Sequence, residues 1–167
     1  LPDQSALFIG SSRPVRDIEA FAKSRSDVSV FANRGLAGID GNISTVFGIT
    51  HEFESTTAIL GDLTFLHDIS ALTNATGGNL RIFVVDNNGG GIFSTLPQAN
   101  ADNFDQLFGT PHNLDLLKVI SGFGISVHKV SNLVELQSSA SKQIKGFEVV
   151  VVNVPSRESN AKQLKAV

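Results

Sequence analysis

Two short apolar runs, with a helical segment between them, constrain the fold of this chain more than any other feature. The runs cover 58–60 and 80–85, and each ends in a polar turn that contains glycine. Such runs are typical of buried strands. The apolar residues from Leu63 to Ala75 have helical spacing. A strand, a helix and a second strand form a right-handed crossover, so we expect parallel strands whose carboxyl ends share one edge of a sheet.

The two turns at this edge carry oxygen ligands. Asp62 follows the first strand, and Asn87 and Gly89 follow the second. Open α/β sheets bind ligands at the carboxyl ends of their strands, so we expect Asp62 and Asn87 to lie close together. A carboxylate, an amide oxygen and backbone carbonyls suit magnesium. The start of the helix near Leu63 and the glycines favour a phosphate, so a metal-bridged diphosphate fits these turns.

Each turn also has a purely structural interpretation. An aspartate between a strand and a helix is often an N-cap, and Asn-Gly clusters are ordinary turns. For Gly61-Asp62 alone, the structural interpretation is favoured. Two such turns at the same edge, one of them with a run of glycines, favour the functional interpretation.

The rest of the chain continues the alternation of strands and helices. The whole pattern, with about six strands, predicts a doubly wound α/β fold with a mostly parallel sheet and helices on both faces. The strand order is not predicted. Segment 92–112, rich in Gln, Asn and Asp, is expected to be a wall, a lid or a partner surface, and 156–167 a frayed tail. The other strands are predicted at 6–9, 28–32, 125–130 and 147–154, and the other helices at 14–23, 43–53, 114–123 and 133–145.

Composition excludes several classes of function. The 167 residues suit one domain, and a net charge of −3 without a Lys/Arg cluster disfavours nucleic-acid binding. The absence of cysteine excludes disulfides, zinc-thiolate sites and a thiol nucleophile. No apolar stretch has the length of a membrane span, and no signal peptide opens the chain. The histidines lack ligand spacing, so each is interpreted as a surface or core residue: His51, His67, His112 and His128.

Three common site motifs are missing. The first predicted strand ends in 10–14 (Gly-Ser-Ser-Arg-Pro), which is not a dinucleotide fingerprint, and 89–91 lacks the Lys-Ser/Thr of a P-loop. Ser12 and Ser94 lack the elbow of a hydrolase nucleophile.

The chain contains no methionine and begins with linker-like residues 1–5. We therefore expect a domain of a longer protein, in which 6–155 form the diphosphate- and metal-binding domain.

Four segments carry a resemblance to a known family. They are 33–41 (NRGLAGIDG), 61–68 (GDLTFLHD), 87–99 (NNGGGIFSTLPQA) and 107–115 (LFGTPHNLD). Together they resemble the C-terminal cofactor domain of the 2-succinyl-5-enolpyruvyl-6-hydroxy-3-cyclohexene-1-carboxylate synthases, thiamine-diphosphate enzymes of menaquinone biosynthesis. The resemblance covers almost the whole chain. One departure is Asp86, which stands where Asn is commoner and could tighten a metal or only cap the turn.

The resemblance implies a role for each matching position. Magnesium or manganese on the cofactor diphosphate would be held by Asp62, the Asn87 side chain and the Gly89 carbonyl, and Ile39 would bend the cofactor into a V shape. The implied cofactor-binding set is Gly38, Ile39, Gly61, Asp62, Leu63, Thr64, Asn87, Gly89, Gly90 and Ile92. The implied substrate-binding set is Ser12, Arg16 and Arg34 for carboxylates, with Ile92, Phe93 and Leu96 as an apolar wall.

The resemblance also implies a reaction and an assembly. A cytoplasmic homo-oligomer, dimeric or tetrameric, would decarboxylate 2-oxoglutarate and add the succinyl semialdehyde carbanion equivalent to isochorismate. The activating Glu would come from a pyrimidine-binding domain that this chain lacks, as it lacks a middle domain. No catalytic residue is therefore assigned here, and the chain alone is expected to be inert. The alternatives are a non-catalytic magnesium- and phosphate-binding regulatory module, or an interaction domain that docks through 92–108.

Overall fold

The computed structural model describes residues 1–36, 38–75 and 77–164, without the side chains of 163 and 164. The first half of the chain builds four strands and the helices between them. These elements are β1 (Ser5–Ile9), α1 (Arg13–Phe21), β2 (Val28–Phe31), α2 (Asn42–Ile49), β3 (Thr56–Gly61), α3 (Asp62–His67), the 3₁₀-helix η1 (Ile69–Asn74) and β4 (Leu80–Asp86).

The second half begins with short helical turns and then returns to the sheet. Its elements are η2 (Gly91–Thr95), η3 (Pro97–Asn100), the π-helical turn η4 (Asp105–Gly109), α4 (Leu116–Ser121), β5 (Ser126–Val130), α5 (Leu133–Ser141), β6 (Phe147–Asn153) and α6 (Arg157–Leu164). No helix in these described ranges combines the length and the apolar character that crossing a membrane requires.

The six strands form one sheet in the order β2-β1-β3-β4-β6-β5, and every pair is parallel. The chain builds outward from β1 to β2 and then returns to place β3 on the other side of β1. This reversal makes a switch point between β1 and β3, where open α/β sheets leave a crevice at their carboxyl edge. The predicted doubly wound, parallel α/β fold is confirmed.

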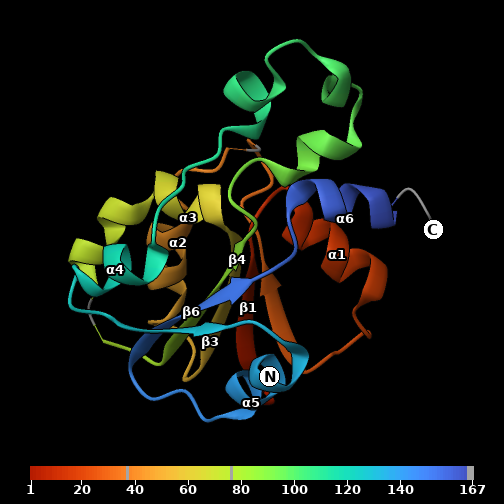
Figure 1. The fold of residues 1–167 in the computed structure, drawn as a ribbon. Coiled ribbons are helices and arrows are strands. Elements are labelled where there is room, and N and C mark those ends of the chain that lie inside the picture. The colour runs from red at the N-terminus through yellow and green to blue at the C-terminus, as the bar shows by residue number, and fades with distance from the viewer. Residues whose placement is uncertain (37, 76, 165–167) are drawn as a thin grey trace.

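Helices cover both faces of the sheet, as Figure 1 shows: α2, α3 and α4 lie on one face and α1 and α5 on the other. Side chains alternate along β4, so Ile82 and Val84 enter the larger core and Phe83 the smaller one. The larger core, under α2, α3 and α4, includes the fully buried Phe8 and Phe65. This face anchors the start of α3, and with it Asp62.

The single helix predicted from Leu63 to Ala75 is wrong, because α3 ends at His67 and η1 follows as a separate element. Asp68 stands at the break with φ −117° and ψ 20°. Its buried carboxylate accepts a hydrogen bond from the backbone N–H of Ser44 in α2 at 2.9 Å. Asp68 thus bonds to α2 at the point where α3 ends.

The predicted frayed tail at 156–167 is also wrong, since it contains α6, although 165–167 lie outside the described residues. Arg157 is 8% exposed, and its Nη2 donates to Asp105 Oδ1 at 2.6 Å. Ala161 is buried as well, and α6 packs against η2. The segment is made mostly of polar residues, so its sequence gives no apolar stripe that would have revealed these anchors.

The helix predicted at 14–23 is observed at Arg13–Phe21, and the other three predicted helices exceed the observed ones by more. The helix predicted at 43–53 ends at Ile49, where single-turn hydrogen bonds from His51 and Glu52 close the element. The helix predicted at 133–145 ends at Ser141, because the Lys142 carbonyl leaves the helix to accept a hydrogen bond from Arg81. The helix predicted at 114–123 covers only Leu116–Ser121.

Candidate active site

A cavity of about 360 Å³ lies at the carboxyl edge of the sheet, at the switch point beside β1 and β3. The segments that follow β1, β2, β3 and β4 line it together with η2. The strand order therefore gathers segments that are distant in sequence. The lining includes every residue that the resemblance assigns to substrate: Ser12, Arg16, Arg34, Ile92, Phe93 and Leu96.

Asp62 occupies the inner wall of this cavity. Its residue is 2% exposed, and its Oδ2 accepts N–H groups from Gly89 at 2.8 Å and from Asn87 at 3.3 Å. Its Oδ1 accepts the Leu63 N–H at 2.7 Å. The expected approach of Asp62 and Asn87 at one edge is thus confirmed. The N-cap of α3 is Gly61, so the interpretation of Asp62 as a simple N-cap is wrong.

The electrostatics of Asp62 favour a cation. Burial raises the pKa of its carboxyl group, whereas the N–H groups of Gly89 and Leu63 and the nearby His112 act in the opposite direction. The neighbouring carboxylate of Asp86 also raises this pKa. The ionised form of a buried carboxylate beside a second carboxylate is stabilised when a cation binds close to both groups.

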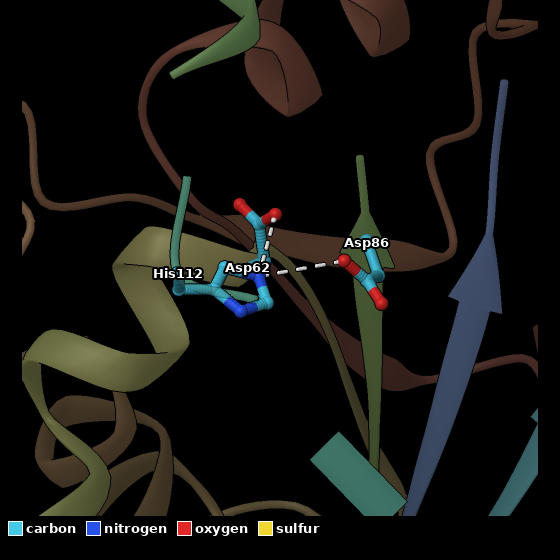
Figure 2. Close-up of side chains that lie close together, drawn as sticks. All are labelled: Asp62, Asp86 and His112. Carbon is cyan, nitrogen blue, oxygen red and sulfur yellow. Dashed lines mark hydrogen bonds and ion pairs between the residues drawn. The ribbon is translucent and has the colours of Figure 1, made fainter. Parts of the chain in front are cut away.

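His112 is the residue of this site that sequence reasoning missed. Its Nε2 lies 3.3 Å from Asp62 Oδ2 and 3.5 Å from Asp86 Oδ1, and its side chain is 8% exposed (Figure 2). Asp62, Asp86 and His112 each offer a ligand atom within 4.8 Å of the others. The distance along the chain between His112 and Asp62 does not match the spacing of known metal ligands, so spacing could not reveal this contact. The only signal in the sequence was that His112 falls in 107–115, one of the four segments that carry the family resemblance.

Of the two roles that the sequence left open for Asp86, the structure shows the capping of the turn, and the tightening of a metal stays a prediction. Its Oδ1 accepts the backbone N–H of Asn88 at 3.1 Å, which is the turn-capping role. The same oxygen faces His112, which places its negative charge beside Asp62. The other histidines lie elsewhere: His51 and His67 are exposed, and His128 pairs with Ser139.

The glycine turn after β4 is shaped by close contact with segment 105–113. Gly89 has φ +132°, and a Cβ atom there would lie 2.2 Å from the Gly109 carbonyl oxygen. A Cβ atom at Gly90 would lie 2.2 Å from the Phe108 carbonyl oxygen. Because neither position has room for a side chain, the backbone of this turn is held against that segment.

The outer side of the cavity carries two exposed guanidinium groups. Arg16 Nη1 donates to the Ser12 carbonyl at 2.6 Å, and Arg34 Nη1 donates to Ser11 Oγ at 3.4 Å. Within the described part of the chain, neither arginine forms an ion pair with a carboxylate. Both arginines are therefore available to an anionic ligand. Ser12, beside them, has φ 74°, a strained conformation at the rim of the cavity.

Apolar side chains close the remaining wall. Phe93 packs on Phe108, with ring centroids 5.5 Å apart, and lines the cavity with Ile92 and Leu96. Of the residues expected to bind cofactor, Gly38 does not line the cavity; its N–H donates to the Leu36 carbonyl in the loop beside it. The rest of that set lies on the cavity wall: Ile39, Gly61, Asp62, Leu63, Thr64, Asn87, Gly89, Gly90 and Ile92.

Comparison with known proteins places this site in a family. The family described as "Thiamine pyrophosphate enzyme, C-terminal TPP binding domain" matches residues 17–154. The chain belongs to this family. The relatives described below share one name, that of a synthase, which disfavours the alternative of a regulatory module.

Several relatives are named 2-succinyl-5-enolpyruvyl-6-hydroxy-3-cyclohexene-1-carboxylate synthase. The protein of Listeria monocytogenes serotype 4b is 38% identical over 96% of this chain and 29% of its own length. That of Bacillus cytotoxicus is 40% identical over 96% of this chain and 28% of its own length. That of Trichodesmium erythraeum is 40% identical over 82% of this chain and 24% of its own length. The chain thus spans less than a third of these relatives.

A solved structure supports the fold. The X-ray structure of a candidate thiamin diphosphate-dependent enzyme from Mycobacterium smegmatis matches with a TM-score of 0.67. The match covers 93% of this chain and 29% of that chain, at 21% identity. At this identity the likeness concerns the fold, which is the thiamine-pyrophosphate-binding α/β fold.

The residues of the cavity fit a divalent cation and a diphosphate. Asp62 Oδ1 accepts only the Leu63 N–H among the hydrogen bonds of the described residues, so a lone pair remains for a cation. Asn87 and Gly89 line the same cavity and carry hard oxygen donors, an amide oxygen and a backbone carbonyl. No atom other than those of the adjacent residues lies within 4 Å of the position that a Cβ at Gly61 would take, so there is open space at the residue that precedes Asp62.

Proposed function

We propose that this chain is the diphosphate- and metal-binding domain of a longer, cytoplasmic synthase that depends on thiamine diphosphate. The activity we propose for that protein is the 2-succinyl-5-enolpyruvyl-6-hydroxy-3-cyclohexene-1-carboxylate synthase reaction of menaquinone biosynthesis. Residues 1–5 would join the domain to preceding chain. The domain would extend beyond 155 to include α6, because Arg157 is buried against Asp105.

One observation carries the proposal: Asp62 and the Asn87–Gly89 turn meet on the wall of a cavity that also holds Arg16 and Arg34. Asp62, the Asn87 side chain and the Gly89 carbonyl would hold Mg²⁺, or Mn²⁺, on the cofactor diphosphate. Ile39, which lines the same cavity, would support the bent cofactor. Hard oxygen donors and a cation-binding carboxylate are the chemistry that a metal diphosphate requires.

The substrate side follows from charge and shape. Thiamine diphosphate, when bound, supplies the carbon nucleophile and electron sink of the reaction. Arg16 and Arg34 would bind the carboxylates of 2-oxoglutarate and isochorismate through charge-assisted hydrogen bonds, together with Ser12. Ile92, Phe93 and Leu96 would exclude water from the place where carbon dioxide leaves and the succinyl unit is transferred.

We assign no proton-transfer group in this chain. The Glu that activates the cofactor in the proposed synthase would come from the pyrimidine-binding domain of a partner subunit, in a homodimer or homotetramer. By itself the chain would therefore bind the cofactor weakly and show no turnover. Measurable product from the 167-residue chain alone would contradict this assignment.

Calorimetric titration with thiamine diphosphate, with and without Mg²⁺, tests the proposal. In the longer protein we expect binding that requires Mg²⁺ and that is lost in Asp62→Ala. Asp102→Ala, which removes an exposed carboxylate, is the matched control and should bind like the parent. Binding of inorganic phosphate and Mg²⁺ without any affinity for thiamine diphosphate would favour the regulatory module instead.

A further inference from the structure

A strap formed by residues 105–114 lies directly on the glycine turn that follows β4. In Figure 1 the excursion from η2 to η4 stands above the carboxyl edge of the sheet, and the strap returns from it toward α4. The Gly90 N–H donates to the Gly109 carbonyl at 2.7 Å. Asn88 and Asn113 exchange two hydrogen bonds, of 2.9 Å and 2.8 Å. The strap and the turn therefore form one hydrogen-bonded unit.

The strap places one side chain against the metal-binding carboxylate. His112 Nε2 lies 3.3 Å from Asp62 Oδ2 and 3.5 Å from Asp86 Oδ1, and Figure 2 marks both contacts with dashed lines. The ring's other nitrogen, Nδ1, accepts the backbone N–H of Leu114 at 3.0 Å. Both ring nitrogens of His112 thus have defined partners.

These partners fix where the ring proton resides. A neutral imidazole has one N–H donor and one acceptor, and Nδ1 is the acceptor because it receives the Leu114 N–H. The proton therefore sits on Nε2, the nitrogen that faces the acids, where it can be donated to Asp62. A nitrogen that carries a proton has no lone pair for a metal, so His112 is a donor here and not a ligand.

We propose, on the basis of the function proposed above, that His112 is a positioning residue that acts on the metal through Asp62. Its Nε2–H would hold Asp62 Oδ2, together with the N–H groups of Gly89 and Asn87, and leave Oδ1 for the cation. Outer partners of this kind orient ligating carboxylates, and their loss typically costs about 10- to 100-fold in metal affinity. The strap thereby joins the cavity wall to the metal site.

The strap has anchors that do not depend on His112. Arg157 in α6 pairs with Asp105 at 2.6 Å, and the Thr110 N–H donates to the Asp105 carbonyl at 2.6 Å. The bonds of Asn113 and Gly109 to the turn also remain when the ring is replaced. A substitution at His112 should therefore leave the strap folded, which separates a positioning role from a structural one.

The first test needs no ligand. A long-range ¹H–¹⁵N spectrum of the histidine side chains in the ligand-free chain should show the proton of the His112 ring on Nε2. The His51 ring, which is exposed, serves as an internal reference for a ring without fixed partners. A His112 ring with its proton on Nδ1 would overturn the proposal, whatever the chain binds.

The second test compares three variants of the longer protein by Mg²⁺ titration in the presence of thiamine diphosphate. His112→Leu removes the donor and should raise the Mg²⁺ concentration for half-saturation by about 10- to 100-fold. His112→Gln keeps an N–H donor of similar reach and should restore most of the affinity. His51→Leu makes the same change at an exposed histidine and should match the parent.

The outcomes distinguish this proposal from the one it rests on. A parent protein that never binds thiamine diphosphate with Mg²⁺ would refute the proposed function, and the positioning role with it. A parent that binds, with a His112→Leu variant of unchanged Mg²⁺ dependence, would refute the positioning role alone. Thermal unfolding of each variant without ligands is the folding control: if His112→Leu melts well below the parent and His112→Gln fails to restore Mg²⁺ affinity, the role is structural and the proposal fails.

Discussion

The two sides of the cavity differ in how firmly the fold holds their functional groups. On the inner side, Asp62 is 2% exposed and accepts N–H groups from Leu63, Asn87 and Gly89. On the outer side, Arg16 and Arg34 are exposed, and each has a single hydrogen-bond partner in the described residues. The fold itself therefore holds the functional group of the inner side, whereas it leaves the two guanidinium groups of the outer side exposed with few contacts.

The physical chemistry of the groups explains this difference. A buried carboxylate is stable only when hydrogen bonds or a counter-charge replace its lost water, so the turn after β4 closes around Asp62. A guanidinium that stays in water needs no such partner, and its long side chain can adapt to an anion of variable shape. Rigidity thus accompanies burial of charge in this site.

The largest effect is expected from removal of the Asp62 carboxylate, which tests whether the inner side of the cavity binds the metal. Asp62→Ala in the longer protein should abolish Mg²⁺-dependent binding of thiamine diphosphate, a loss beyond the roughly 100-fold expected for an outer partner. Calorimetry measures the effect, and Asp102→Ala is the control. If Asp62→Ala kept the parent's affinity, the inner side would not be the metal site.

A second substitution tests whether the inner side is rigid. Gly89→Ala should destabilise the chain by at least about 1–3 kcal/mol, because φ +132° is strained for alanine and the new Cβ would meet the Gly109 carbonyl oxygen. Urea unfolding measures the change in free energy.

Gly48→Ala is the matched control for this experiment. Gly48 lies exposed in α2 with no atom within 4 Å of an added Cβ, so the control should stabilise the chain by about 0.5–1 kcal/mol. Equal stabilities of the two variants would show that the turn after β4 accommodates a Cβ atom without loss of stability, and the inner side would then not be rigid.

The outer side should respond to substitution in the opposite way. Arg16→Ala and Arg34→Ala should leave the melting temperature of the chain unchanged, because neither side chain is buried. In the longer protein each should raise the KM for the carboxylate substrates about 10-fold, through loss of a charge-assisted hydrogen bond. Steady-state kinetics and thermal unfolding give the two readouts.

Arg25→Ala removes an exposed arginine that pairs with Asp27 and Asp3, and it is the control for charge alone. A large loss of stability in Arg16→Ala or Arg34→Ala, with the KM unchanged, would reverse the comparison between the two sides.

The smallest effect is expected at Asp115, beyond the end of the strap. The Lys118 N–H, with help from the Lys118 ammonium, holds the pKa of Asp115 below its ordinary 3.8. A lowered pKa stabilises the fold above the ordinary value, and this contribution is lost as the pH falls through the lowered pKa. Asp115→Asn keeps the capping oxygen and should lose slightly less stability on acidification.

Thermal unfolding of Asp115→Asn and its parent, from neutral pH to below pH ~3, measures this difference. Because Asp115 is exposed, the difference should be small beside the effects at the cavity. If Asp115→Asn lost more stability than its parent in acid, the negative charge of Asp115 would not contribute to the stability of the fold.

Much of the fold could be predicted because its signals are local. The apolar runs at 58–60 and 80–85 became β3 and β4, with no end displaced by more than two residues. The crossover rule for strand, helix and strand then brought Asp62 to Asn87 without any knowledge of strand order. Periodicity failed at Asp68, where a partner on α2 decides where the helix ends.

The residues of the site divide in the same way. Asp62, Asn87 and Gly89 were found because strand ends and glycine turns are visible in the sequence. His112 was missed because its contact with Asp62 joins residues 50 positions apart through a strap without regular structure. The burial of Arg157 was missed because a polar segment gives no sign of the pocket that receives it.

The sequence by itself determined the parallel α/β layers and the edge at which oxygen ligands collect, since both follow from local periodicity and chain handedness. Only the tertiary structure decided the strand order, the path of the strap and the partner of each ring nitrogen of His112. Those features depend on side-chain hydrogen bonds between distant segments, and such bonds leave no periodic trace along a chain.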